Sequence, residues 1–175
     1  EILISFFAWS FGNKIYQVTA TSSGSPLVAG ILLLGGSNSS STKIFNNLVG
    51  LVYAPNANTV SAGNPTVNGI RLDVSTLTSS IELSFNSIYL DAFSSGTNFS
   101  SAGVYQTVAF NALPTTSNLI MRNNLIYNTS TPSGFGLTTA YQRSSSNKSN
   151  YNASSNRNLF YAGIPSANRL IYTDT

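Results

Sequence analysis

Hydrophobic residues occur in short runs that Gly, Pro, Asn, Ser and Thr interrupt along the whole chain. The runs favour Ile, Val, Leu, Tyr and Phe, which are common in β-strands, and helical periodicity is nearly absent. Apolar and polar residues alternate in residues 81–85, so Ile81, Leu83 and Phe85 are expected to share an inner face. The pattern predicts an all-β fold of short strands separated by turns and polar loops.

One short motif recurs: an Asn, any residue, an apolar residue and then Tyr, which is Gly in the second copy. Its Asn positions, spaced by 34, 39, 38 and 34 residues, are Asn13, Asn47, Asn86, Asn124 and Asn158. A second marker, Gly followed by an apolar residue, keeps step with the first at Gly30, Gly69, Gly103 and Gly136. A near-constant period of this length is typical of repeat architectures. With three short strands per period, we predict a single right-handed parallel β-helix of about five coils.

Asparagine suits these corners for two physical reasons. It tolerates a left-handed backbone better than other residues with a Cβ, so it can turn the chain sharply between strands. Stacked one per coil, the amides can also hydrogen-bond along the axis as a ladder. The residues two positions after each Asn are predicted to point inward: Ile15, Val49, Ile88, Ile126 and Phe160. The residues after the Gly markers form a second predicted inward stack: Ile31, Ile70, Val104 and Leu137.

The residues three positions after each Asn should point outward. They are Tyr16, Gly50, Tyr89, Tyr127 and Tyr161. Because neighbouring coils lie roughly 4.8 Å apart, Tyr89, Tyr127 and Tyr161 are expected to form an external stripe. Such a stripe either stabilises the wall of the β-helix or contacts a carbohydrate or another protein. These three tyrosines are therefore the candidate contact residues.

The chain resembles the right-handed parallel β-helix repeat proteins, which are pectate-lyase-like in fold. The likeness spans about residues 11–172 and is closest to large secreted surface proteins of Bacteroidetes-type bacteria. The segments that carry it are 85–92, 94–99 and 122–132. The resemblance implies secretion, display at the cell surface and a longer parent chain with export and sorting segments.

Composition narrows the possible chemistry. Charged residues make up only 7% of the chain, against roughly 25% in ordinary domains, and the net charge of +3 comes from scattered basic residues. No dense basic stripe is present, so nucleic-acid binding is not expected. Because Cys and His are both absent, we expect no cofactor, no metal site and no thiolate or imidazole catalysis.

Length and the apolar start limit the domain organisation. The 175 residues are expected to form a single domain, as a fragment of a longer secreted chain. The apolar stretch 2–9 is too short to span a membrane and lacks the basic region of a signal peptide, so membrane insertion is not expected.

An enzymatic function would need clustered carboxylates to bind calcium or cleave a glycosidic bond. The acids are few: Glu1, Asp73, Glu82, Asp91 and Asp174. Asp73 lies two residues from Arg71, and an exposed ion pair is expected there. A cluster of Asp73, Glu82 and Asp91 on adjacent coils is the arrangement that would favour an enzyme. With so few acids, we predict that the chain is not an enzyme.

The sequence therefore favours a non-enzymatic structural or adhesive surface protein that assembles end to end. The expected partners are copies of the chain or missing segments of its parent, in contact with residues 1–11 and 159–172, since open sheet edges must be covered or paired. The alternative is a carbohydrate-binding or polysaccharide-cleaving module, with a polysaccharide as partner.

Overall fold

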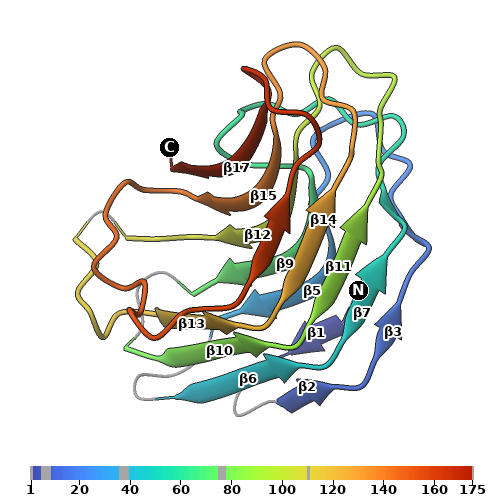
Figure 1. Ribbon diagram of the computed structural model, residues 1–175. Helices are drawn as coiled ribbons and strands as arrows, with labels where there is room; N and C mark the ends of the chain where they lie inside the picture. The colour runs from blue at the N-terminus through green and yellow to red at the C-terminus, as the bar shows by residue number, and fades with distance from the viewer. Residues whose placement is uncertain (1, 5–8, 36–39, 75–77, 110, 175) are drawn as a thin grey trace.

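The computed structural model describes residues 2–4, 9–35, 40–74, 78–109 and 111–174. Residues 1 and 5–8 of the predicted end contact at residues 1–11 lie outside this part. The described part contains seventeen strands and no helix. Parallel strands stack coil upon coil into a β-solenoid of about four turns, which confirms the predicted all-β parallel β-helix (Figure 1).

Three parallel sheets run along the solenoid. Sheet A contains β1 (Ile2–Ile4), β5 (Val28–Leu34), β9 (Val67–Asp73), β12 (Ser101–Gln106), β15 (Thr138–Arg143) and β17 (Arg169–Asp174). Sheet B contains β2 (Trp9–Phe11), β6 (Ser41–Phe45), β10 (Ser80–Ser84) and β13 (Asn118–Arg122). Sheet C contains β3 (Lys14–Ile15), β7 (Leu48–Gly50), β11 (Ser87–Leu90), β14 (Leu125–Asn128) and β16 (Leu159–Tyr161). A fourth, two-stranded sheet pairs β4 (Val18–Thr19) with β8 (Val52–Tyr53).

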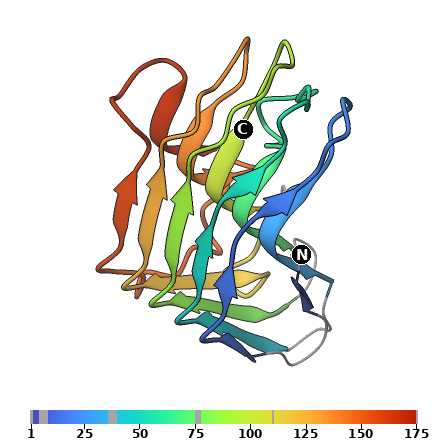
Figure 2. The ribbon, with the colours of Figure 1, turned by 90° about the vertical axis from the view of Figure 1, so that its right-hand side faces the viewer.

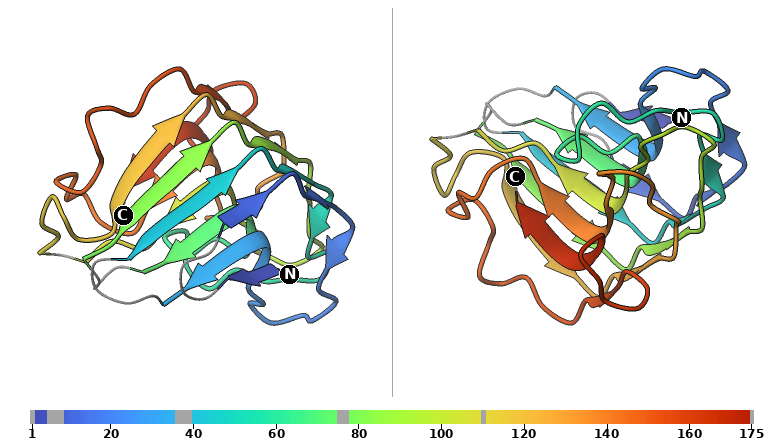
Figure 3. Two further views of the ribbon diagram at one scale, coloured as in Figure 1. Left: turned by 90° about the horizontal axis from the view of Figure 1, so that it is seen from below. Right: turned by 90° about the horizontal axis from the view of Figure 1, so that it is seen from above.

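Successive coils stack along one axis, with the first and last strands at opposite ends of the stack (Figures 2 and 3). The fifth coil is incomplete, because no regular strand of sheet B precedes β16. In place of a strand, two isolated parallel bridges, Leu119–Tyr151 and Arg122–Asn156, pair this part of the chain with β13. The serine-rich composition of residues 143–155 explains why a loop replaces the strand here.

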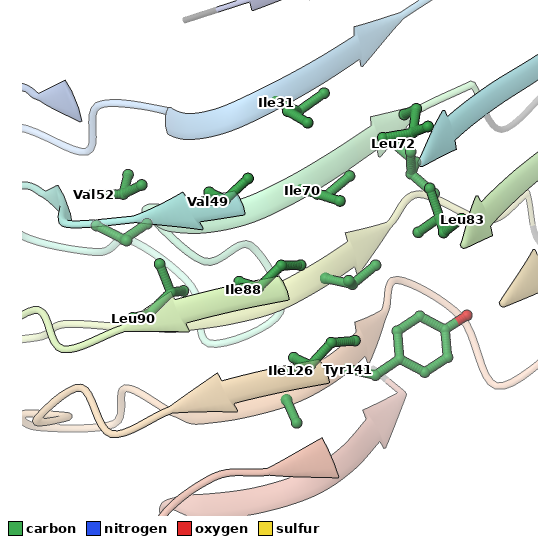
Figure 4. Packing of buried hydrophobic residues seen from close by; sticks show 14 of the residues in the cluster. Ile31, Val49, Val52, Ile70, Leu72, Leu83, Ile88, Leu90, Ile126 and Tyr141 are labelled. Atoms are coloured by element: carbon green, nitrogen blue, oxygen red, sulfur yellow. The ribbon is translucent and has the colours of Figure 1, made fainter. Parts of the chain in front are cut away.

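Aliphatic side chains fill the solenoid in columns along the axis (Figure 4). In the predicted inward column of sheet C, Ile15, Val49, Ile88 and Ile126 are buried, and Phe160 is partly buried and packs against the core. The prediction for residues 81–85 is right for Ile81 and Leu83 and wrong for the last residue of the run. Ile81 and Leu83 are buried, whereas Phe85 turns outward with 61% of its surface exposed.

The glycine column exists because sheet C approaches sheet A very closely. A Cβ added to Gly30, Gly69 or Gly103 would lie 2.3–2.4 Å from a methyl group of Val49, Ile88 or Ile126 respectively. Real Cβ contacts are not this short, so the packing of each coil requires a residue without a side chain at this position.

Gly136 was wrongly assigned to this column. It precedes β15, and the register places Tyr141 beside Val104. The fourth coil therefore continues the inward stack with Tyr141 in place of the predicted Leu137, and Ala140 precedes it where the other coils have Gly. Gly136 instead lies in the loop before β15, where an added Cβ would clash with the backbone carbonyl of Phe99.

The outer face of sheet A is covered by the loop that follows β8. The Nε2 of Gln142 donates to the carbonyl of Ala62 at 2.8 Å, across 80 residues of sequence. The guanidinium of Arg71 donates to Oδ1 of Asn64 at 2.8 Å and lies 4.4 Å from the ring centre of Tyr105. This cover leaves the outer faces of sheets B and C as the faces available for contact.

Candidate functional site

The five motif asparagines form one hydrogen-bonded column at the corner between sheets B and C. Each Nδ2 donates to the Oδ1 of the next Asn along the axis, at distances of 2.9, 2.9, 3.0 and 2.8 Å. The backbone N–H of the same residue donates to the same oxygen at 3.0–3.3 Å. The second Nδ2 hydrogen reaches back to a carbonyl of sheet B in four coils, for example from Asn86 to Ile44 at 2.8 Å. The structure thus brings together Asn13, Asn47, Asn86, Asn124 and Asn158.

The prediction that the column Asn adopts the left-handed conformation is wrong. At each corner, the residue before that Asn adopts it. Positive φ angles of 54–67° occur at Gly12, Asn46, Phe85, Asn123 and Arg157. The column Asn keeps its side chain inward for the ladder, so the preceding residue must make the turn. That residue is Gly or Asn in three of the five coils, and this was the sequence signal for the turn. Phe85 and Arg157 adopt the conformation at a cost of roughly 1–2 kcal/mol each.

The two ends of the column carry unmatched and complementary groups. In the described part of the chain, the Oδ1 of Asn13 accepts no hydrogen bond, because its donors would come from a preceding coil. At the other end, the Oδ1 of Asn158 accepts hydrogen bonds from Asn124, but the backbone N–H of Asn158 donates to no acceptor among the described residues. The column therefore ends in an acceptor on one side and a donor on the other.

The candidate tyrosines stack on the outer face of sheet C. Ring centres are 5.7 Å apart for Tyr89 and Tyr127 and 4.5 Å apart for Tyr127 and Tyr161, with interplanar angles of 25° and 22°. Stacking covers the faces of the middle ring and leaves ring edges and hydroxyl groups toward solvent. The pKa of the Tyr127 hydroxyl is raised, mainly by desolvation and to a smaller extent by the neighbouring Tyr161. The hydroxyl is therefore neutral at physiological pH.

A hollow of about 390 Å³ lies beside this tyrosine column, lined by Leu48, Ser87, Ile88, Tyr89, Leu125 and Tyr127. It forms because the small Ser87 lies in register between Leu48 and Leu125. Strands β7, β11, β14 and β16 contain no charged residue. From β7 to β16, the outer face of sheet C is thus an uncharged surface of aromatic and aliphatic groups with a shallow depression, and the exposed Lys14 lies at its β3 edge.

The candidate carboxylates are not brought together. Asp73 pairs with Arg71 at 2.9 Å, Glu82 with Lys43 at 3.8 Å, and Asp91 accepts a hydrogen bond from Thr129. An exposed ion pair was predicted at Arg71, and this is wrong for the arginine. The loop after β8 covers its guanidinium and leaves Arg71 8% exposed. The described residues contain no group of three acids that could hold a metal ion.

Sequence reasoning missed a polar cluster inside the last coils. Gln106, Tyr141 and Arg143 are buried within the solenoid and hydrogen-bonded to one another. Arg143 opens a serine-rich segment, which made it look like a loop residue. The useful signal was its place at the end of a strand, two residues after an inward position.

Comparison with models of protein families, with curated proteins and with solved structures finds no match for this chain. In the part of the chain that the structure describes, no helix is long and apolar enough to cross a membrane.

Proposed function

We propose that the chain is a non-enzymatic structural or adhesive protein of the extracellular or cell-surface class, and that it assembles end to end. The observation that carries this proposal is the acceptor left at Asn13 and the donor left at Asn158. The resemblance to secreted β-helix surface proteins supports the location. The separate partners of Asp73, Glu82 and Asp91 support a role without catalysis.

The register of sheet C defines how two copies would stack. If β3 of one copy lies against β16 of another, the N–H of Asn158 meets the Oδ1 of Asn13 and the amide ladder continues. Tyr161 then comes beside Tyr16, which is 56% exposed, and Leu159 comes beside Lys14. Such a contact is heterologous, so each copy leaves a free end and the assembly grows as a filament.

Two substitutions of Leu159, one to a positive and one to a negative residue, test this register. Leu159→Lys places a like charge beside Lys14 of the stacked copy and should weaken association about two- to fivefold, while Leu159→Glu should strengthen it by a similar factor. Leu125→Lys makes the same change at an equivalent outward position of a middle coil and should leave association unchanged. Sedimentation velocity over a range of protein concentrations measures association, and electron microscopy shows whether filaments form.

Opposite shifts for the two charges at position 159, with none for Leu125→Lys, support stacking in this register. A wild-type chain that stays monomeric at every concentration contradicts end-to-end assembly. Equal weakening by Lys at positions 125 and 159 indicates lateral contact through sheet C and contradicts the proposed end contact.

The second candidate function is binding of a neutral carbohydrate on the outer face of sheet C. The hollow at Ser87 favours it, because apolar walls beside tyrosine hydroxyls suit the two kinds of surface on a sugar ring. Ser87→Leu fills the hollow and should abolish co-sedimentation with insoluble neutral polysaccharides, whereas Ser41→Leu, on the outer face of sheet B, should not. No co-sedimentation of the wild-type chain would eliminate this candidate.

A further inference from the structure

The last coils enclose a cavity of about 450 Å³ at the C-terminal end of the solenoid. Four aromatic side chains form most of its wall: Tyr141, Tyr151, Phe160 and Tyr172. Two cations, Arg143 and Lys148, and the aliphatic Ile171 complete it. Figure 4 shows Tyr141 beside Ile126, in the lower part of the aliphatic cluster. Volume, aromatic wall and few polar groups are all typical of small-molecule sites.

The interior of sheet A changes from apolar to polar toward this end. Leu33 and Leu72 occupy one inward column in the first coils, and the next three coils have Gln106, Arg143 and Asp174 in register with them. A solenoid interior needs no polar groups for stability, and burying them is costly unless they are paired. The polar residues therefore require a role other than filling the core.

Arg143 is a buried cation without a buried counter-ion. It is 1% exposed, and its Nη1 donates to Oε1 of Gln106 at 2.8 Å and to the hydroxyl of Tyr141 at 2.9 Å. Its Nη2 donates to the carbonyl of Asn147 and to Oδ1 of Asn150, and its Nε has no partner. All these acceptors are neutral, and burial raises the pKa of Tyr141, so no phenolate balances the charge.

The second cation, Lys148, already has a carboxylate as its counter-ion. The Nζ of Lys148 lies 3.3 Å from a carboxylate oxygen of Asp174, which also accepts a hydrogen bond from the Tyr172 hydroxyl at 2.9 Å. The hydrogen bond from Tyr172 lowers the pKa of Asp174, so this carboxylate stays charged. Arg143, Lys148 and Asp174 together leave the cavity with one unbalanced positive charge.

We propose that this cavity binds a small aromatic carboxylate, with its ring between the aromatic walls and its carboxylate toward the two cations. The ring gains the contacts that aromatic pairs prefer, and the carboxylate balances the charge of Arg143. A stacked copy of the chain would cover this cavity. The register would place β1 of that copy against β17. The site is therefore accessible only at an end where no copy is stacked.

The test uses 4-hydroxybenzoate and its neutral analogue 4-hydroxybenzamide as probes. Both are titrated calorimetrically into the intact chain at a concentration where sedimentation shows a monomer, because a stacked copy would cover this end. We expect the acid to bind at least about tenfold more tightly than the amide, which is about 1.4 kcal/mol. Added salt should reduce this preference.

A bulky substitution separates the cavity from the rest of the surface. Ile171 lines the cavity and is 54% exposed, so Ile171→Trp should fill it and abolish binding of the acid. Ile164 is 82% exposed and does not line the cavity, so Ile164→Trp is the matched control and should bind normally. Circular dichroism checks that both variants keep the fold.

Equal affinity for acid and amide, or undiminished binding by Ile171→Trp, overturns the proposed site. Absence of binding by the wild-type monomer at millimolar probe also overturns it. Filament formation is measured separately by sedimentation, so a failure of this site and a failure of end-to-end assembly are distinguishable.

Discussion

Replacing Asn86 with alanine is expected to lower the free energy of unfolding by roughly 3–5 kcal/mol. Asn86 is 1% exposed, and its side chain connects three coils. Its Oδ1 accepts from the Nδ2 and N–H of Asn47, and its Nδ2 donates to Oδ1 of Asn124 and to the carbonyl of Ile44. Truncation leaves several buried polar groups without partners, and each costs about 1–3 kcal/mol.

Urea unfolding followed by circular dichroism measures this change. Asn156→Ala is the matched control, because Asn156 is exposed and outside the column, and its effect should stay within about 0.5 kcal/mol. Asn13→Ala should fall between the two, since Asn13 is half-buried and has a column neighbour on one side only. Equal losses for Asn86→Ala and Asn156→Ala would show that the ladder contributes little to stability.

The repeat explains why so much of this fold was predictable from the sequence. Each coil solves the same packing problem, so Asn47, Asn86 and Asn124 appear at matching positions and reveal the column that they form. Inward positions of sheet C followed from the same spacing. The errors arise where a residue's role depends on its neighbours in space. Phe85 alternates correctly with the strand before it, but its left-handed conformation turns it outward.

The candidate sites were less predictable, because they depend on contacts between coils. The hollow at Ser87 exists only because larger residues lie beside it in the adjacent coils. Burial of Arg71 depends on the loop after β8, and burial of Arg143 depends on Gln106 and Asn150. No local pattern marks Ser87 or the burial of Arg71. The tyrosine stack, in contrast, followed directly from the period.

Replacing Gly69 with alanine is expected to destabilise the solenoid by about 2–3 kcal/mol through overpacking. An added Cβ would lie 2.4 Å from Cγ2 of Ile88 and 2.5 Å from the carbonyl oxygen of Gly103. The second clash is with backbone, which cannot move without straining the adjacent coil. Gly24→Ala is the control, because the nearest atom to its Cβ is 3.6 Å away, and it should change stability by less than about 0.5 kcal/mol.

A double-mutant cycle separates the two clashes. Ile88→Ala removes the methyl group that meets the new Cβ, so Gly69→Ala should cost less in that background than in the wild type, with a coupling energy of about 1 kcal/mol. The remaining cost reports the clash with the Gly103 carbonyl. The fourth coil tolerates Ala140 at the equivalent position, where Phe160 replaces the β-branched Ile126 of the coil before it. Strict additivity of the two substitutions would mean that sheet C does not impose glycine on sheet A.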